Sequence, residues 1–321
     1  MRLTLSCLMM IALAAGCAAG EKGAADCADG FEKNTDGDCV SADTDTDTDT
    51  DTDTDTGSEA SIGWRSAGAG SSHSCGITSV DTVVCWGHNN YGQASPPPGS
   101  FKSISLGQIH SCGITAEDTL RCWGSDSIDR TNPPSGTFVS VSADLHHSCA
   151  VTTAGHIECW GDVTEPAAIP PSGTFKSVSV SSYHSCGITT SDTIECWGDP
   201  FGEEADAPSG TFKSVSTGDS YSCGVTTSGS LECWGTHTLH SDAPSSGPYK
   251  RVSAGGHICA ITDADAVECW ASFNGNGEGD PPTGSFDDLS VGKGHSCAVT
   301  TTGEMLCWGD NHTGQTMPPR L

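Results

Sequence analysis

Residues 184–198 read HSCGITTSDTIECWG, and this phrase decides the fold of the chain. Its frame, a Cys, nine further residues, a second Cys and then Trp, occurs seven times, and successive first cysteines lie 37, 37, 37, 37, 36 and 38 residues apart. A fixed period of this length is typical of solenoids, propellers and arrays, in which each unit buries its apolar face against a neighbour. The pairs are Cys75/Cys85, Cys112/Cys122, Cys149/Cys159, Cys186/Cys196, Cys223/Cys233, Cys259/Cys269 and Cys297/Cys307.

The two ends of the repeat region are complementary. An aromatic residue precedes each first Cys by eleven positions, or by ten in the shortened sixth unit. The last unit stops at Leu321, where one more aromatic would follow, and the first unit begins with that residue, Trp64. This arrangement predicts a closed ring, since an open solenoid needs polar capping units at both ends. The aromatic residues are Trp64, Phe101, Phe138, Phe175, Phe212, Tyr249 and Phe286.

Each unit reads as three short strands separated by turn residues, and no window shows helical periodicity. In the third unit, placing Cys149 opposite Cys159 leaves a three-residue turn, 153–155, whose last position requires left-handed backbone. Only Asp and Gly, which tolerate that conformation, occupy this position. The pattern predicts one disulfide within each hairpin. The left-handed positions are Asp81, Asp118, Gly155, Asp192, Gly229, Asp265 and Gly303.

Strand alternation places the Trp after each second Cys on the same side as the residue after each first Cys. That second residue is always Gly or Ala, as at Gly76, Gly113 and Ala150. We expect each Trp to fill the gap to an adjacent unit, where the small residue leaves room.

The N-terminal part predicts export. Residues 1–16, with Arg2 and the apolar stretch 8–15, predict a signal peptide that is too short to span a bilayer. Residues 13–17, LAAGC, resemble a bacterial lipoprotein processing site. This resemblance implies that Cys17 is acylated and that the protein is anchored to the outer membrane or cell surface. The alternative is ordinary cleavage nearby that leaves Cys17 free.

Composition divides the rest of the chain. Residues 17–42 form the lipidated segment with one small disulfide loop, Cys27/Cys39. Residues 43–60, with seven Asp-Thr dipeptides, predict a disordered stalk, and residues 61–321 form the repeat domain. Eighteen cysteines in an exported chain indicate disulfides. With Cys7 removed in the signal and Cys17 acylated, the other sixteen make eight pairs.

The chain is strongly acidic, with a net charge of −28. Residues 57–321 alone carry 28 acidic and 10 basic side chains. Such a surface repels phosphate backbones, which excludes nucleic acid as a partner. We expect a monomer that meets the membrane only through its N-terminal lipid.

Residues 85–93, CWGHNNYGQ, and 307–315, CWGDNHTGQ, together with the repeated HSCGIT phrase, resemble repeats of the regulator of chromosome condensation family. That resemblance implies a seven-bladed β-propeller. The short period is more similar to that of propeller-type β-lactamase inhibitory proteins, whose blades have three strands. The predicted fold is therefore all-β, a seven-bladed propeller with three-stranded blades and one disulfide per blade. The Asn-x-x-Gly-Gln turn is expected only in units one and seven.

Six units place a His two residues before the first Cys, and the fifth has Tyr221 there. Such a set suggests either a metal-binding ring or a structural hydrogen bond to a loop in each blade. Repetition in phase with the core favours the structural role, because metal sites are normally single constellations. The sequence predicts no metal site, no cofactor and no catalytic motif. The histidines are His73, His110, His147, His184, His257 and His295.

The segment after each Trp-Gly differs from unit to unit, while the core positions are nearly constant. Divergent loops on a uniform scaffold are typical recognition sites, and aromatics among polar residues are typical anchors. The sequence therefore predicts a binding scaffold for a protein or glycan, with ligand-binding residues Tyr91, Phe201, Phe273, His88 and His312. One alternative is a passive envelope protein. Another is a secreted hydrolase or lyase that uses a loop-borne group from His237, His240, Glu203, Glu204 and His312.

Overall fold

The structure, a computed structural model, describes residues 31–33, 39–41, 62–198, 206–236, 247–271 and 274–321. Contacts divide the chain into two compact units, Met1–Gly57 and Ser58–Leu321. In the first unit, β1 (Phe31–Lys33) pairs with β2 (Cys39–Ser41) in antiparallel fashion. The residues described include no helix that is long and apolar enough to cross a bilayer. Outside them lie the predicted signal peptide, Cys17, Cys27 and the Asp-Thr segment.

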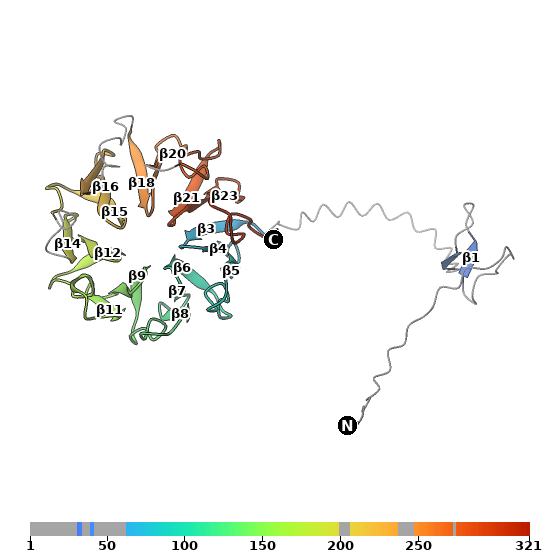
Figure 1. Cartoon of the computed structure of the whole chain (residues 1–321), viewed down its shortest axis with the longest axis horizontal. Coiled ribbons are helices and arrows are strands. Elements are labelled where there is room, and N and C mark those ends of the chain that lie inside the picture. Colours follow the sequence, from blue (N-terminus) through green and yellow to red (C-terminus); the bar gives the residue numbers. More distant parts are fainter. Residues whose placement is uncertain (1–30, 34–38, 42–61, 199–205, 237–246, 272–273) are drawn as a thin grey trace, which may run out of the picture. The chain divides into compact units, whose positions relative to one another are not determined.

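The second unit contains seven three-stranded antiparallel sheets, here blades 1–7, arranged around a ring (Figure 1). The first strand of each blade lies nearest the centre, and sheet order follows chain order, so one repeat makes one blade. The predicted all-β propeller with three-stranded blades is confirmed. The strands are β3 Trp64–Ala69, β4 His73–Thr78, β5 Val83–Gly87; β6 Phe101–Leu106, β7 His110–Thr115, β8 Leu120–Gly124; β9 Phe138–Ala143, β10 His147–Thr152, β11 Ile157–Gly161; β12 Phe175–Val180, β13 His184–Thr189, β14 Ile194–Gly198; β15 Phe212–Thr217, β16 Tyr221–Thr226, β17 Leu231–Gly235; β18 Tyr249–Ala254, β19 Ile258–Thr262, β20 Val267–Trp270; and β21 Phe286–Val291, β22 His295–Thr300, β23 Met305–Gly309.

The hairpin between the second and third strands has the predicted register. The third turn residue has positive φ in every blade, from 64° at Asp81 to 93° at Gly229. The two cysteines lie directly opposite each other in every blade and form a disulfide with Cα atoms 4.0–4.1 Å apart, so the predicted disulfide of each blade is confirmed. The bonded pairs are Cys75–Cys85, Cys112–Cys122, Cys149–Cys159, Cys186–Cys196, Cys223–Cys233, Cys259–Cys269 and Cys297–Cys307.

The two cysteines of a disulfide differ in burial, which the sequence did not indicate. The first Cys stands on the middle strand of its blade and is fully buried, because strands cover it on both sides. The second Cys stands on the outer edge strand and is only partly buried, against the cluster between blades. All of these cysteines form structural cross-links within their blades. The partly buried members are Cys85, Cys122, Cys159, Cys196, Cys233, Cys269 and Cys307.

The left-handed turn residue also joins each blade to the next. Its carbonyl oxygen accepts a hydrogen bond from the backbone N–H of the aromatic residue that begins the following blade. For example, the Phe101 N–H donates to Asp81 O over 2.9 Å, and the Trp64 N–H of blade 1 donates to Gly303 O of blade 7 over 2.8 Å. Blade 7 thus meets blade 1 through the contact that joins the other blades, and the ring is closed.

The hydrophobic core lies between blades. One cluster joins the buried Cys75 and Ile77 of blade 1 to Phe101 and Trp123 of blade 2, so the expectation that Trp fills the gap between units is confirmed. The expected role of the small residue is wrong. A Cβ on Gly113 would lie 2.7 Å from Cδ1 of Phe101, the first-strand aromatic of the same blade. Strand alternation gave the right face but could not identify which aromatic approaches it.

The repeated histidines bind serines of the next blade. His73 Nε2 lies 2.8 Å from Ser111 Oγ, and the same contact recurs in six of the seven blades at 2.6–3.3 Å. Ser111 donates its own proton to Gln93 O, so it accepts from the Nε2–H of His73. The structural role expected for these histidines is therefore present, with a strand serine as partner in place of a loop.

Five of the six imidazoles have a lowered pKa and are neutral at pH 7. All six are buried, and five of their Nδ1 atoms have no hydrogen-bond partner among the described residues. Burial lowers the pKa of His73 and of His110 to about 3, and at His110 the nearby Arg130 guanidinium adds to this effect. Burial also lowers the pKa of His147, His257 and His295 to about 4.

In the one place where the His-Ser contact is missing, both of its partners have been replaced. Blade 5 has Tyr221 in place of His, and blade 6 has Ile258 in place of the receiving Ser. The Tyr221 hydroxyl donates to the backbone oxygens of Gly255 and His257, both at 3.0 Å, and Ile258 is fully buried beside it. A polar pair has been replaced as a unit by an apolar contact with a backbone hydrogen bond.

We predict that Gly113→Val destabilises the propeller by about 1–3 kcal/mol, because the added methyls collide with Phe101. Gly113→Ala should cost clearly less, since blade 3 already accommodates Ala150 at this position. Urea unfolding of both variants measures the difference. Equal stability of the Val variant and the unchanged protein would show that the Phe101 contact has been misassigned.

We predict a steep loss of stability on acidification. The unfolded chain takes up protons on His below pH about 6.5, whereas the folded histidines resist protonation to about pH 3–4. Stability is therefore fully present above pH about 6.5 and falls as the pH drops toward 4, by up to about 1.4 kcal/mol per pH unit for each His.

The double variant His110→Tyr with Ser148→Ile copies the natural pair of blades 5 and 6. Between pH about 6.5 and 4, its urea-unfolding free energy should change less steeply with pH, because unfolding of the variant takes up as much as one proton fewer. A comparison at pH about 8, where His is neutral in both states, isolates any change in packing. An unchanged slope would contradict the assignment of His110 as a buried neutral group.

Candidate functional site on the loop face

Two sets of loops share one face of the ring, here the loop face. The inner and outer strands of a blade run in the same direction, so the segments that follow them emerge together. Backbone bonds join the two sets: the His88 N–H donates to Ser72 O over 2.9 Å, and the Asp162 N–H donates to His146 O over 3.0 Å. The hairpin turns that contain the left-handed residues occupy the opposite face, here the hairpin face.

Four of the outer loops share one shape. In blade 1 the Asn89 Oδ1 accepts the Ala94 N–H over 2.9 Å, and Gly92 has φ +81°. The same side-chain bond occurs at Asn311, Asn274 and Asp126. The expectation that this turn survives only in units one and seven is therefore wrong, because Asn-x-x-Gly-Glu and Asp-x-x-Asp-Arg adopt it too. Both central residues of these four loops vary, at 90–91, 127–128, 275–276 and 312–313, and blade 2 also has Asp126 and Asp129 where the other three loops have Asn and Gly.

The Tyr91 side chain projects from this turn into solvent. Its side chain is 56% exposed, and its ring centroid lies 6.1 Å from that of His88. The fully buried Gln93 supports both residues: its Oε1 accepts the Tyr91 N–H over 3.0 Å, and its Nε2 donates to His88 Nδ1 over 2.8 Å. A large aromatic with one polar tip is thus presented on a fixed turn, as suits a binding anchor.

His312 lies on the equivalent turn of blade 7, with its side chain 80% exposed and Nδ1 against the Asp310 carboxylate. The neighbouring Thr313 hydroxyl donates to Ser72 O over 2.8 Å, the same oxygen that accepts the His88 N–H. The loops of Tyr91, His88 and His312 therefore meet where blade 7 joins blade 1. Phe201, Phe273, His237, His240, Glu203 and Glu204 lie outside the described residues.

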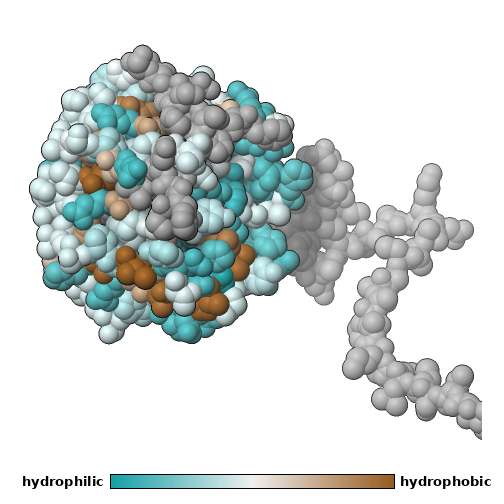
Figure 2. Space-filling model, turned by 60° about the vertical axis from the view of Figure 1, so that its left-hand side comes forward, coloured by the Kyte–Doolittle hydropathy of each residue, from teal (hydrophilic) through white to brown (hydrophobic). Residues whose placement is uncertain are grey.

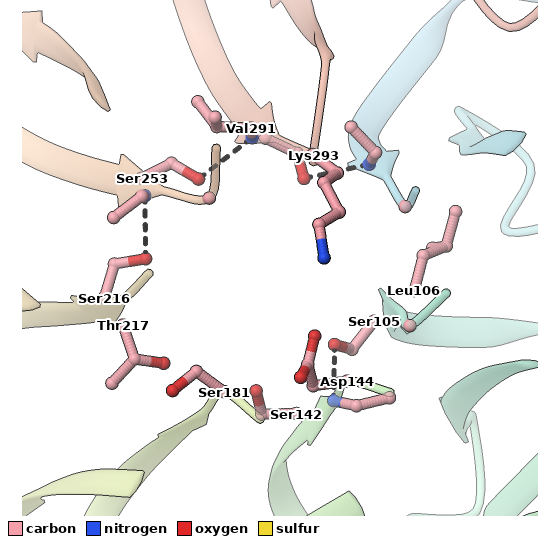
Figure 3. A pocket seen from close by; sticks show the side chains of 18 of the residues that line it. Ser105, Leu106, Ser142, Asp144, Ser181, Ser216, Thr217, Ser253, Val291 and Lys293 are labelled. Carbon is pink, nitrogen blue, oxygen red and sulfur yellow. Dashed lines mark hydrogen bonds between the residues drawn. The ribbon is translucent and has the colours of Figure 1, made fainter. Parts of the chain in front are cut away.

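A second feature of the loop face is the central channel, a cavity of about 180 Å³ lined by the inner strands (Figure 3). Inner-strand serines face the next blade and accept its backbone N–H groups, as Ser105 accepts from Ala143 over 2.9 Å and Ser253 from Val291 over 3.0 Å. Near the mouth, Asp144 and Lys293 project into the channel (Figure 3).

Among the described residues at the mouth, carboxylates outnumber ammonium groups. Lys293 Nζ lies 3.4 Å from Asp219 Oδ2, and Asp144 Oδ2 accepts a hydrogen bond of 2.7 Å from the Ser182 hydroxyl. Burial raises the pKa of the Asp144 carboxyl, so its charged form is held at a cost. Sequence reasoning missed this group, although the departure of Asp144 from a repeated Gly was visible in the alignment of units.

The two faces differ in how their carboxylates are paired. On the hairpin face, basic residues at the start of the inner strands pair with the Asp of a hairpin turn, as in Arg65–Asp81 at 2.8 Å and Lys176–Asp192 at 2.6 Å. On the loop face, the described part of the chain shows no ion pair to Asp126, Asp129 or Asp162. In the view of Figure 2 the surface is mostly hydrophilic, with hydrophobic residues in small patches.

Comparisons with known proteins agree with this architecture. The family model of the regulator of chromosome condensation (RCC1) repeat matches residues 64–93, 175–201 and 286–315. A search of curated proteins finds no match to the chain. The CRINKLY WD40 ectodomain of the receptor kinase ACR4 from Arabidopsis thaliana is 25% identical, with 79% of this chain and 97% of that chain covered and a TM-score of 0.66.

Two further solved structures share the fold. The ectodomain of the Physcomitrella patens receptor kinase CR4 is 23% identical, with 77% of this chain and 74% of that chain covered and a TM-score of 0.66. Yeast RCC1 (Prp20), solved bound to Kap60, is 12% identical, with 73% and 80% covered and a TM-score of 0.61. The chain thus carries RCC1-type repeats in three of its segments and folds as a disulfide-linked propeller similar to these proteins.

Proposed function

We propose that the protein is an exported scaffold, anchored through its N-terminus, that binds a protein ligand on the loop face where blades 7 and 1 meet. The observation that carries this proposal is Tyr91, whose exposed ring lies 6.1 Å from the ring of His88 on a turn fixed by the buried Gln93. The four similar turns keep their frame while their central residues change, which is the pattern of a recognition surface on a constant scaffold.

The electrostatics favour a basic partner. The hairpin face pairs its basic residues with turn carboxylates, whereas Asp126, Asp129 and Asp162 on the loop face form no ion pair within 4.0 Å among the described residues, and Asp162 is attracted to Arg130 only at longer range. An excess of negative potential steers a positively charged surface toward this side of the ring. A protein partner is also in keeping with the similar yeast propeller, which was solved bound to Kap60 and studied for its binding to Gsp1p and histones.

The location follows from cysteine chemistry. Seven disulfides fit an oxidising, extracellular environment. We extend this to a lipid anchor: removal of residues 1–16, acylation of Cys17, and a stalk formed by residues 43–60 that carries the propeller away from the membrane. The Asp-Thr composition has no apolar side chain to bury and suits such a stalk.

We predict that the expressed full chain incorporates a radiolabelled fatty acid and fractionates with membranes. Cys17→Ser should lose the label and move to the soluble fraction, because the acylated thiol is gone. Cys7→Ser is the matched control, since Cys7 leaves with the signal peptide, and it should keep the label. Retention of label in the Cys17→Ser protein would overturn the anchor assignment.

We predict that Tyr91→Ala weakens partner binding at least tenfold, because it removes the central aromatic anchor. The partner is first captured from culture with the tagged full-length protein, and its affinity is then measured by biolayer interferometry. Tyr183→Ala is the matched control: Tyr183 is also exposed, at 59%, but belongs to blade 4. Equal loss from both variants, or none from Tyr91→Ala, would contradict the site; specific binding to a glycan array would replace the protein partner by a glycan.

A further inference from the structure

The mouth of the channel has one position per blade that leaves almost no room for a side chain. This mouth position is occupied by Gly in five blades, and an added Cβ would collide with the carbonyl of the following blade. The distances from that Cβ are 2.6 Å from Gly70 to Gly107 O, 2.4 Å from Gly255 to Gly292 O, and 2.1 Å from Gly292 to Gly70 O. Contacts below 3.0 Å with backbone atoms require a shift of the main chain. The seven residues are Gly70, Gly107, Asp144, Ser181, Gly218, Gly255 and Gly292.

Only Ser181 and Asp144 depart from Gly, and only Asp144 brings a charge. Ser181 has a structural explanation, because its hydroxyl bonds with His184 O and lies 3.0 Å from His184 Nδ1. Asp144 instead directs its carboxylate into the channel (Figure 3). Its burial raises its pKa, so both its size and its charge are unfavourable to folding at this place. Asp144 accepts a hydrogen bond from the Ser182 hydroxyl, but a neutral side chain could accept that bond, so the charge at a position that is Gly in five blades marks Asp144 as a functional candidate.

The residue that follows the mouth position in the chain is also charged in a minority of blades. It is small or uncharged in five blades, but blade 5 carries Asp219 and blade 7 carries Lys293. Lys293 Nζ is 3.4 Å from Asp219 Oδ2 and extends over the channel in Figure 3. Two carboxylates and one ammonium therefore surround a cavity of about 180 Å³. The mouth keeps one uncompensated negative charge, which one incoming cation would neutralise.

We propose that the channel mouth binds a primary alkylammonium group, with Asp144 accepting its hydrogen bonds and the Lys293–Asp219 pair setting the charge balance. The channel is lined mostly by Ser, Gly and Ala, with apolar side chains such as Leu106 and Val291, and its volume of about 180 Å³ fits a slender aliphatic chain ending in an ammonium better than a bulky group. A charge-assisted bond to a partly buried carboxylate is among the stronger polar contacts. Hydroxyls such as that of Thr217, also in the lining, supply further acceptors.

This site deepens the proposed function, because a lysine of a basic partner docked on the loop face would enter the mouth. A free aliphatic diamine would offer the same group without a partner protein. The chemistry is common to both sources, and the experiments below separate them. An acidic ligand is disfavoured, since the only cation at the mouth is already beside Asp219 among the residues described here.

Calorimetric titration of the full-length protein with cadaverine tests the site, and glutarate, of equal length but opposite charge, is the control probe. We expect saturable cadaverine binding and none of glutarate. Asp144→Asn should weaken cadaverine binding at least tenfold, while Asp263→Asn, an exposed acid of the hairpin face outside the channel lining, should leave it unchanged. Asp144→Gly restores the residue of five other blades; it should abolish cadaverine binding without lowering the midpoint of urea unfolding.

Each result either supports the channel site or overturns it. Absence of cadaverine binding, or equal binding to the unchanged protein and to both Asp144 variants, overturns the channel site, and loss of partner binding in Tyr91→Ala would still stand as evidence for the loop face. If Asp144→Asn weakens both cadaverine and the captured partner, a lysine of that partner is the ligand. If it weakens cadaverine alone, a free amine is the ligand.

Discussion

Each blade must bury both of its faces against neighbours, and this constraint governs the rest of the structure. A sheet of three short strands encloses no core of its own, so Cys75 and Ile77 of one blade reach solvent unless Phe101 and Trp123 of the next cover them. Two directional bonds fix how the neighbours meet. One runs from the first aromatic N–H to the left-handed residue of the preceding blade, and the other from His to Ser.

These bonds explain why the interior of the repeat scarcely varies. A His at position 73 is useful only if a Ser stands at position 111, and the natural double exception at Tyr221 and Ile258 shows that the two positions change together. The imidazole must stay neutral to fit, which couples the closed ring to pH. Variation is tolerated where these bonds end, at the loop tips and at the channel mouth.

The candidate functional residues are those that differ from their equivalents in the other blades. Tyr91 departs from its equivalents at the tip of a constant turn, and Asp144 departs from Gly at a position too crowded for a side chain. The two lie on the same face of the ring, where Asp126 and Asp129 form no ion pair among the described residues, whereas turn carboxylates of the hairpin face pair with Arg65 and Lys176. A disulfide in every blade allows the scaffold to carry such unfavourable groups, because it restricts the unfolded chain.

Local features were predictable from the sequence, since they depend on residues close together in the chain. The ten-residue Cys spacing, the Asp or Gly at the left-handed turn and the 37-residue period determined the hairpins, the disulfides and the number of blades. Tyr91 and His312 could be selected as exposed loop residues for the same reason, and His88 as a partly buried residue of the same loop. Contacts between distant residues were decided only by the tertiary structure. Alternation could not tell that Phe101 rather than Trp approaches Gly113, because it specifies a face and not a distance. Nor could it place Asp144 beside Asp219 and Lys293, because these residues lie on three separate blades and share one cavity only once the ring has closed.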